Sequence, residues 1–383
     1  MNQNTGVSAF RAVSFLLCLA PVFLLLQICK LHEFRHGNPG WNRFDDDYND
    51  SSQKVMDAIQ RAAEKPIIVA KMTDHFFSPG DFQGPQDCKD FDDIPLTCIF
   101  EEKESLGEEG TNSADVHWYH APHFESRDLA KTKKAHPSQL RCVVSMESSA
   151  NYPQLDDPVY MKQFDIESSY GRSSDIPMYD FNLYKVSVES LRKEPLPLSE
   201  KRDAIAYVQT NCNTKNRRQE IMQAIVDLGI VTVNGLGLCG KQLKGASTNP
   251  LSDAILGGRY DKDHDSSKIE VFRSHKFCIA IENSNVQDYV TEKIWQPLMA
   301  GCVPIYYGSP DIKDIIPDPN AILHYPDFDN DPEKLSREID RLINDDDAYL
   351  EKLAWKKKPL EQWSPSFQAY VKEVAVETHQ CRL

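Results

Sequence analysis

The chain has 383 residues, of which 40% are hydrophobic and 26% are charged, and its formal net charge is -15 at pH 7. This length allows two domains of ordinary size, and the composition is that of a globular protein, so general disorder is excluded. Because nucleic-acid phosphates bind to basic surfaces, the acidic balance also argues against a nucleic-acid partner.

The first predicted element is an uncharged apolar run over residues 12–29. Its length is at the low end of what crosses a bilayer as a helix. Arg11 before this run also fits a cleaved signal peptide, but the length and the lack of a small-residue cleavage site favour a retained anchor. We therefore expect a membrane-anchored protein with a cytoplasmic tail at 1–11, a transmembrane helix at 12–29 and a translocated body.

Polar and acidic residues at 30–54 are expected to form a stem, in which the sequon at Asn49 would be accessible for glycosylation. The ten cysteines of the chain indicate an oxidising compartment. Eight of them lie outside the apolar run, and the sequence leaves their pairing open. No Cys-x-x-Cys pair or Cys/His cluster indicates zinc.

Beyond the stem, short β-rich runs alternate with helical patterns, which predicts a parallel sheet with helices on its faces. The strands expected in the first half are residues 67–72, 96–100, 115–120 and 140–146. Residues 101–113 are charged and contain glycine, so we expect a loop there. The prolines and mixed charges of residues 190–203 predict a linker after a first domain at 55–195.

A second series of the same kind predicts a separate sheet in a domain at 204–355. The expected strands are residues 204–210, 230–234, 276–282, 303–308 and 321–325. After the first of these, Asn211 or Asn213 can cap a helix that ends at Gly229, and residues 332–343 form a later amphipathic helix. Two such domains facing a cleft would bind a ligand at the carboxyl ends of their strands.

The chain ends in residues 356–383, which are expected to form a helix and tail. Trp355 and the lysines at 356–358 are predicted to belong to a solvated helix. The acidic run at 345–347 is interpreted as a solvated loop.

Another helix is expected to begin near Asp288. It would place Tyr289, Glu292 and Lys293 on one face, because they stand at i, i+3 and i+4. The helix N-terminus would offer free N–H groups that attract phosphate, and Lys293 would add a full positive charge. The alternative is that Glu292 and Lys293 are ordinary surface residues of an amphipathic helix.

This stretch carries a family resemblance. The run from Phe277 to Ile312 is similar to the donor-site signature of the α1,3-fucosyltransferase family (glycosyltransferase family 10), in which an E-N-x(5)-Y-x-T-E-K block recurs. The matching residues are Glu282, Asn283, Tyr289, Thr291, Glu292 and Lys293. Cys278 departs from family members that carry an aromatic residue at its position.

Two further segments resemble the same family. Residues 207–225 resemble its S-N-x(6)-R segment, with Thr210 in place of the serine and Arg218 at the arginine position. The island Val143–Ser148 resembles its M-x-L-E-S-type island, which places Glu147 at the carboxyl end of a strand. The similarity extends over about 204–355 and thins to short islands before the linker.

The resemblance implies an α/β protein of the GT-B type, with two Rossmann-like domains facing a cleft, that transfers fucose from GDP-fucose with inversion. The first domain would bind the acceptor and the second would hold GDP-fucose. By match to the family, Glu147 would accept the proton of the attacking hydroxyl. Arg218 and Lys293 would stabilise the charge of the leaving diphosphate.

Five further residues are expected to line the nucleotide-sugar pocket. Glu292 would hydrogen-bond fucose or nucleotide hydroxyls, and Tyr179 is a further candidate on the guanosine side. The remaining candidates are Asn211, Asn283 and Tyr289. Because a Lys/Arg clamp would hold the diphosphate, we expect no metal site and no required cofactor, with a divalent cation as a stimulant at most. The D-x-D of residues 327–329 is interpreted as a loop or cap.

The predicted function is therefore transfer of L-fucose from GDP-fucose, in α1,3 linkage, to a GlcNAc of a glycoprotein glycan. The predicted location is the Golgi membrane, in a single-pass type II protein whose catalytic part is luminal. One alternative is a protein hydroxyl as the acceptor. Another is a catalytically idle sugar-binding scaffold of the secretory pathway.

Overall fold

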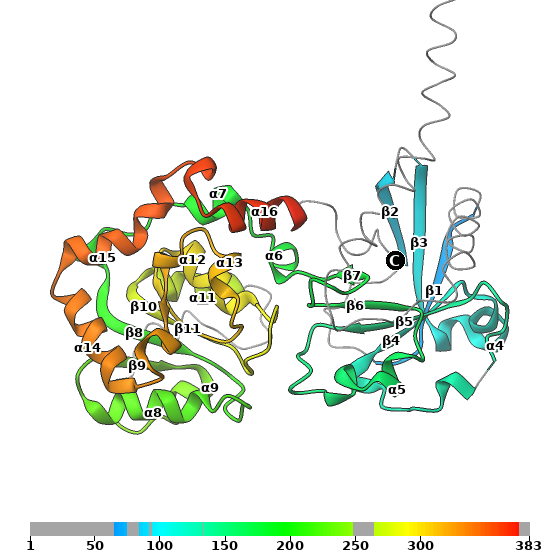
Figure 1. Cartoon of the computed structure of the whole chain (residues 1–383), viewed down its shortest axis with the longest axis horizontal. Coiled ribbons are helices and arrows are strands. Elements are labelled where there is room, and N and C mark those ends of the chain that lie inside the picture. Colours follow the sequence, from blue (N-terminus) through cyan, green and yellow to red (C-terminus); the bar gives the residue numbers. More distant parts are fainter. Residues whose placement is uncertain (1–64, 75–83, 92–93, 132, 248–263, 375–383) are drawn as a thin grey trace, which may run out of the picture. The chain divides into compact units, whose positions relative to one another are not determined.

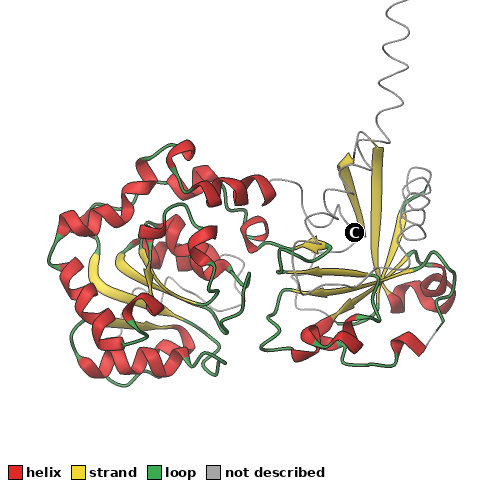
Figure 2. Cartoon of the chain, viewed as in Figure 1, coloured by secondary structure: helices red, strands yellow, loops and turns green. Residues whose placement is uncertain are grey.

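The computed structural model describes residues 65–74, 84–91, 94–131, 133–247 and 264–374 (Figures 1 and 2). The predicted tail, anchor and stem, with the sequon at Asn49, lie outside these ranges. Within them, no helix has the length and apolar character needed to span a bilayer. Residues 65–383 form one compact unit that holds two sheets, and the predicted domain boundaries remain predictions.

The first sheet has seven strands in the order β2-β3-β1-β4-β5-β6-β7. Their bounds are β1 Ile67–Lys71, β2 Gly84–Phe91, β3 Ile94–Glu102, β4 Val116–His120, β5 Leu140–Ser145, β6 Ile166–Ser169 and β7 Ile176–Pro177. All neighbours are parallel except β2, which runs antiparallel to β3. The four expected strands of this half are confirmed as β1, β3, β4 and β5, whereas β2, β6 and β7 carry no clear sequence pattern. Apolar side chains such as Phe100, Trp118 and Val144 form its core.

The loop expected at 101–113 is wrong, because most of it is the helix α4 (Lys103–Ser113). Gly107 interrupts this helix with φ 66° and ψ -176°, a backbone conformation that side-chain-bearing residues avoid. The helix buries none of its side chains. Its sequence therefore lacks the apolar periodicity by which a helix is usually predicted.

The second sheet has five parallel strands in the order β12-β11-β10-β8-β9. Their bounds are β8 Arg202–Val208, β9 Thr232–Leu236, β10 His275–Ile281, β11 Val303–Tyr307 and β12 Leu323–His324. The five expected strands of this half are confirmed. All seven residues of the central β10 are buried, as expected for a parallel strand covered on both faces.

Helices cover both faces of this sheet (Figure 1). The α-helices after α4 are α5 Pro158–Met161, α6 Asp180–Leu183, α7 Val188–Arg192, α8 Arg218–Leu228, α9 Gly237–Gly240, α11 His264–Arg273, α12 Glu292–Ala300, α13 Ile312–Ile315, α14 Pro332–Ile343, α15 Asp346–Leu353 and α16 Pro365–Val374. Alternate residues of β10 point to opposite faces. Phe277 and Ile279 pack with α8, α14 and α15, whereas Ala280 packs with α12 and α16.

The helix α8 begins later than expected. Its N-cap is Arg217, in a left-handed conformation with φ 59°, and neither Asn211 nor Asn213 caps it. Instead, the side-chain oxygen of Asn211 accepts a hydrogen bond from the backbone N–H of Asn213 at 3.3 Å, which stabilises a turn. The predicted end at Gly229 is confirmed, with φ 62°.

Among the described residues of the second half, two disulfides form, Cys212–Cys239 and Cys278–Cys302. Cys278 of β10 is joined to Cys302, the residue before the neighbouring strand β11, at a position where the family resemblance leads one to expect an aromatic residue.

The solvated helix expected around Trp355 is also wrong. Trp355 is buried, and the buried Lys356 donates hydrogen bonds from Nζ to the carbonyl oxygens of Leu191 and Leu298. The lysine run gave no sign of this, because a buried lysine needs partners that only the folded chain supplies.

Candidate functional site

Glu147 lies two residues after the end of β5, where parallel α/β sheets commonly carry functional groups. Its backbone is held by Ser145, whose hydroxyl accepts from the Glu147 N–H at 3.1 Å and donates to the Glu147 carbonyl at 2.9 Å. This double contact turns the chain sharply after the strand. The turn presents the carboxylate at the edge of the sheet.

The carboxylate of Glu147 meets two residues of the family signature. Its Oε2 atom accepts hydrogen bonds from Asn283 Nδ2 at 3.3 Å and from the Tyr289 hydroxyl at 3.4 Å. Asn151 Nδ2 is a third donor, at 3.4 Å. Two predicted site residues, Asn283 and Tyr289, therefore donate to one oxygen of a third, Glu147, which lies at least 136 positions away in the sequence.

Tyr289 is a well-held donor. Its side chain is buried, and its ring packs edge-on against Tyr170, with 5.0 Å between ring centroids. Burial, followed by the nearby charge of Glu147, raises the pKa of the Tyr289 hydroxyl well above its ordinary value. The hydroxyl therefore keeps its proton and donates a hydrogen bond to Glu147.

The helix expected to begin near Asp288 begins at Glu292, with Thr291 as its N-cap. Asp288 has a left-handed backbone with φ 64°, which a continuous helix cannot contain. Tyr289 therefore lies in the preceding loop, and the predicted helical face shared with Glu292 and Lys293 does not exist. Tyr289 reaches Glu147 because the loop, rather than a helix, sets its direction.

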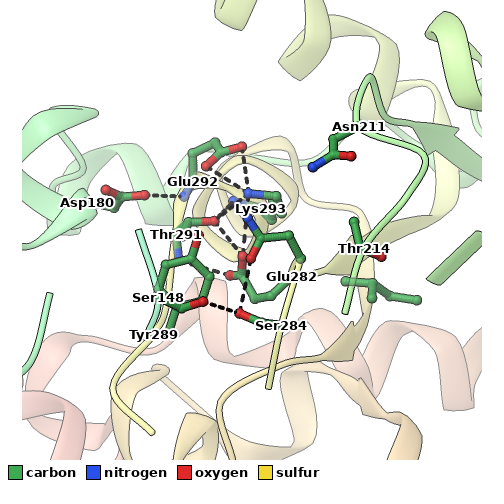
Figure 3. Close-up of polar contacts among 12 residues, drawn as sticks. Ser148, Asp180, Asn211, Thr214, Glu282, Ser284, Tyr289, Thr291, Glu292 and Lys293 are labelled. Carbon is green, nitrogen blue, oxygen red and sulfur yellow. Dashed lines mark hydrogen bonds and ion pairs between the residues drawn. The ribbon is translucent and has the colours of Figure 1, made fainter. Parts of the chain in front are cut away.

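Glu282 matches the family signature but was not among the predicted site residues. It is fully buried at the end of β10, and its carboxylate accepts from the backbone N–H of Thr291 at 2.9 Å and from Thr291 Oγ1 at 2.7 Å (Figure 3). Burial raises the pKa of Glu282, and the charge of Lys293 opposes that effect. A polar residue directly after the apolar run 277–281 was the sequence signal that could have identified it.

Lys293 lies between two carboxylates. Its Nζ is 3.4 Å from Glu282 Oε2 and 3.2 Å from Glu292 Oε1, and it donates to Thr291 Oγ1 at 2.8 Å. Burial works against its charge, but Glu292 and Glu282 outweigh it and raise the pKa of Lys293 above its usual value. Lys293 is therefore charged, and the carboxylates of Glu282 and Glu292 neutralise much of that charge.

Glu292 is ionised for a related reason. Burial raises its pKa, but Lys293 and Lys268 outweigh burial and lower the pKa of Glu292 to about 2. Lys268 Nζ lies 4.0 Å from the Glu292 carboxylate. The surface-residue alternative for Glu292 and Lys293 does not hold, because only 20% of the Glu292 side chain and 13% of the Lys293 side chain are exposed.

The N-terminus of α12 is not free to bind phosphate, contrary to the expectation from sequence. The N–H of Thr291 is bonded to Glu282, and the N–H of Glu292 donates to Asp180 Oδ2 at 2.9 Å (Figure 3). The N–H of Lys293 lies 3.5 Å from Thr291 Oγ1. Asp180, which sequence reasoning missed, belongs to α6, and no motif connects it with α12.

Arg218 is not a solvated helix residue, because only 1% of it is exposed. Its guanidinium donates to the carbonyl of Ile281 at 3.0 Å and to the carbonyl of Asn211 at 2.8 Å. It therefore joins the end of β10 to the loop after β8. Its Nε has no hydrogen-bond partner among the described residues, which leaves one buried N–H for an anionic ligand. Burial lowers the pKa of Arg218, which stays charged.

The side chains of two predicted residues, Tyr179 and Asn211, take no part in the site contacts described above. The hydroxyl of Tyr179 donates to the carboxylate of Glu373, and its ring packs edge-on against Tyr370 with centroids 5.6 Å apart. The side chain of Asn211 is exposed. The next residue, Asp180, connects Tyr179 to the start of α12.

Metal binding finds no support in the described ranges, where no group of three or more His, Cys, Asp and Glu side chains is placed to hold an ion. Both aspartates of the D-x-D at residues 327–329 are paired with lysines. Asp327 accepts from Lys313 Nζ at 2.7 Å, and Asp329 accepts from Lys334 Nζ at 2.7 Å. This agrees with its interpretation as a loop or cap.

The site defined by this geometry is a set of carboxylates, buried cations and an amide at the carboxyl ends of parallel strands. Residues 198–383 match the family model described as glycosyltransferase family 10 (fucosyltransferase), C-terminal part. This match confirms, for the second half of the chain, the resemblance read from the signature residues.

Individual relatives carry two kinds of name. A GDP-fucose protein O-fucosyltransferase 3 of Rattus norvegicus is 29% identical over 248 residues, which are 63% of this chain and 48% of the relative. An alpha-(1,3)-fucosyltransferase B of Drosophila melanogaster is 23% identical over 240 residues, 60% of this chain and 51% of the relative. The chain thus matches about half the length of these relatives.

Among solved structures, an α1,3-fucosyltransferase with GDP-fucose aligns with 84% of this chain and 95% of its own, with a TM-score of 0.47 and 16% sequence identity.

Proposed function

We propose that the protein is an inverting fucosyltransferase that uses GDP-fucose. One observation carries the proposal: Glu147 Oε2 is hydrogen-bonded to both Asn283 and Tyr289 of the family signature. A carboxylate beside the donor-site residues is what an inverting transfer requires, because one group must remove the acceptor proton while the leaving group departs. The family match of residues 198–383 supports the same donor.

The reaction would proceed in one displacement. The acceptor hydroxyl oxygen forms a bond to C1 of fucose, and its proton passes to the carboxylate of Glu147. The bond between C1 and the β-phosphate oxygen breaks, and its electron pair leaves with GDP. Arg218, whose buried Nε has no hydrogen-bond partner among the described residues, stabilises the charge that develops on the diphosphate. Lys293 adds to this stabilisation, although Glu282 and Glu292 offset part of its charge. The ionised Glu292 accepts hydrogen bonds from sugar hydroxyls.

We propose a GlcNAc of a glycoprotein glycan as the acceptor, in α1,3 linkage, as the family resemblance implies. The name of the Drosophila relative supports the α1,3 linkage. A protein hydroxyl is the second candidate, because the relative from Rattus norvegicus, named a protein O-fucosyltransferase, is more similar to this chain, at 29% against 23% identity. A Golgi location and a type II anchor at 12–29 belong to the same proposal.

The test is fucose transfer by the full chain, purified in detergent, with GDP-fucose and two acceptor panels. One panel holds lactosamines and N-glycans, and the other holds folded protein domains with free Ser and Thr hydroxyls. Glu147→Gln should lower kcat by roughly 10²- to 10⁴-fold, as expected for loss of a general base, while GDP binding by calorimetry is unchanged. Glu351→Gln, a change at an exposed carboxylate of α15, is the control.

Each result has one meaning. Transfer to GlcNAc identifies the first acceptor, and transfer only to a protein hydroxyl identifies the second. No transfer to either panel, with intact GDP binding, would leave the idle scaffold as the function. An active Glu147→Gln variant would remove Glu147 from the base role.

A further inference from the structure

Two buried serines connect the loop of the proposed base with the loop of the donor signature. Ser148 Oγ and Ser284 Oγ are 2.6 Å apart, although 136 positions separate them in the sequence (Figure 3). Both side chains are shut off from solvent, with 0% and 1% exposure. Each serine directly follows a residue of the site, because Ser148 follows Glu147 and Ser284 follows Asn283.

The direction of every hydrogen bond in this group is fixed. Ser284 Oγ donates to Asn283 Oδ1 at 3.1 Å, which uses the single proton of that hydroxyl. Ser148 must therefore be the donor in the pair of serines. The orientation of the Asn283 amide is set by Glu147, because a carboxylate oxygen accepts and therefore faces the NH₂ group, with Nδ2 at 3.3 Å from Oε2. The amide oxygen is thereby left to accept from Ser284.

The result is a closed ring of four residues. Hydrogen bonds run from Ser148 to Ser284, then to Asn283 and on to Glu147, and the peptide bond between Glu147 and Ser148 completes it. All three side-chain donors to the Glu147 carboxylate approach Oε2. Among the described residues none donates to Oε1, so this oxygen is the one that can take a proton from an acceptor.

The geometry points to Ser148 and Ser284 as positioning residues of the transfer reaction, which act through Asn283 to keep Glu147 Oε2 occupied and Oε1 available. This inference rests on the proposed function of Glu147. Tyr289 and Asn151 also hold Oε2, so the ring contributes part of the orientation. Loss of one neutral hydrogen bond changes an equilibrium by about 3- to 10-fold, which is the size of effect expected here.

The test measures kcat and KM for GDP-fucose in the full chain with Ser148→Ala, Ser284→Ala and the double variant. We expect Ser284→Ala to lower kcat by about 3- to 10-fold and to leave KM within about 2-fold, because Asn283 loses its orienting donor. Ser148→Ala should have a smaller effect, because Ser284 can still donate. The double variant should equal Ser284→Ala, because Ser148 acts only through Ser284.

Ser336→Ala is the matched control, since Ser336 is equally buried and donates to the carbonyl of Pro332 at 2.7 Å in α14. It should lower stability without changing kcat. Losses in the Ser148→Ala and Ser284→Ala variants that multiply would overturn the inference, as would a loss matched by Ser336→Ala.

Failure of the proposed function gives a different result from failure of this inference. If the wild-type chain transfers no sugar, the proposed function fails. A crystal structure of Ser284→Ala then shows whether the hydrogen bond from Ser284 orients Asn283. A rotated Asn283 whose Nδ2 has left Glu147 supports the positioning role. An unchanged Asn283 refutes it.

Discussion

The backbone N–H of Glu292 donates a hydrogen bond to the carboxyl of Asp180 at 2.9 Å. Asp180 is buried, and burial followed by the charge of Glu292 raises its pKa well above the ordinary value of 3.8. The protonated form of Asp180 is therefore favoured. In that form it serves as an acceptor at the start of α12 without adding a third negative charge beside Glu282 and Glu292.

Replacement of Asp180 separates its role as an acceptor from its charge. Asp180→Asn keeps a side-chain oxygen for the N–H of Glu292 and should be close to wild type in stability near pH 4 and at least as stable as wild type at pH 7. Asp180→Ala leaves that N–H without a partner and should lower the free energy of unfolding by about 1–3 kcal/mol in urea titrations. Equal losses in both variants would show that Asp180 acts as a charged group.

The pH dependence of the same variant has a definite sign. A raised pKa means that the folded protein binds the proton more tightly than the unfolded chain does. The stabilisation is present below the unfolded pKa of about 4 and is lost as the pH rises toward the folded pKa. Asp180→Asn should therefore gain stability relative to wild type as the pH increases from 4 to 8. A constant difference across this range would contradict the assignment.

Lys293 balances two carboxylates, of which Glu282 is fully buried. Lys293→Met should lower the free energy of unfolding by roughly 3–5 kcal/mol, because it leaves buried negative charge without a partner. Adding Glu282→Gln should recover part of this loss. Urea titrations of the two single variants and the double variant measure the coupling, and strictly additive losses would show that the two groups do not interact.

The two disulfides should differ in their resistance to reduction. Cys278 and Cys302 are both buried, whereas Cys212 is partly exposed. Because exchange requires access of a thiolate to sulfur, a mild reductant should open Cys212–Cys239 first, and Cys278–Cys302 only on unfolding. Alkylation followed by mass mapping reports the order. Native-state reduction of both pairs at one rate would contradict it.

Lys356 should make the free energy of unfolding depend on pH in the alkaline range. Burial, followed by the charge of Lys201, lowers its pKa from 10.5 to about 7. Between these two values the unfolded chain binds more protons than the folded protein, so stability should increase with pH from about 7 to 10.5. Burial also lowers the pKa of Lys201, to about 8, which acts in the same direction.

The measurement is the free energy of unfolding across this pH range for wild type and Lys356→Met. The increase should be smaller in the variant, while Lys357→Met, at an exposed neighbouring position, should keep the wild-type slope. An unchanged slope in Lys356→Met would assign the dependence to another group.

Local pattern predicted much of the fold. We could predict β10, β11 and α14, because the spacing and apolar character of their residues indicate which of them are buried. The start of α12 was not, because one left-handed residue, Asp288, and the cap at Thr291 set it. For the site, the signature predicted Asn283, Tyr289, Glu292 and Lys293, but it did not indicate Asp180. Their predicted roles in transfer await the experiments above.

The sequence by itself determined the strand segments, the family signature and the residue types of the site. Only the tertiary structure decided that Glu147 meets Asn283 and Tyr289, and that Asp180 and Glu282 occupy the N-terminus expected to bind phosphate. The physical reason is the sequence separation over which each interaction acts. Periodicity and caps depend on neighbours a few positions apart, whereas these contacts join residues as far as 142 positions apart, which only packing brings together.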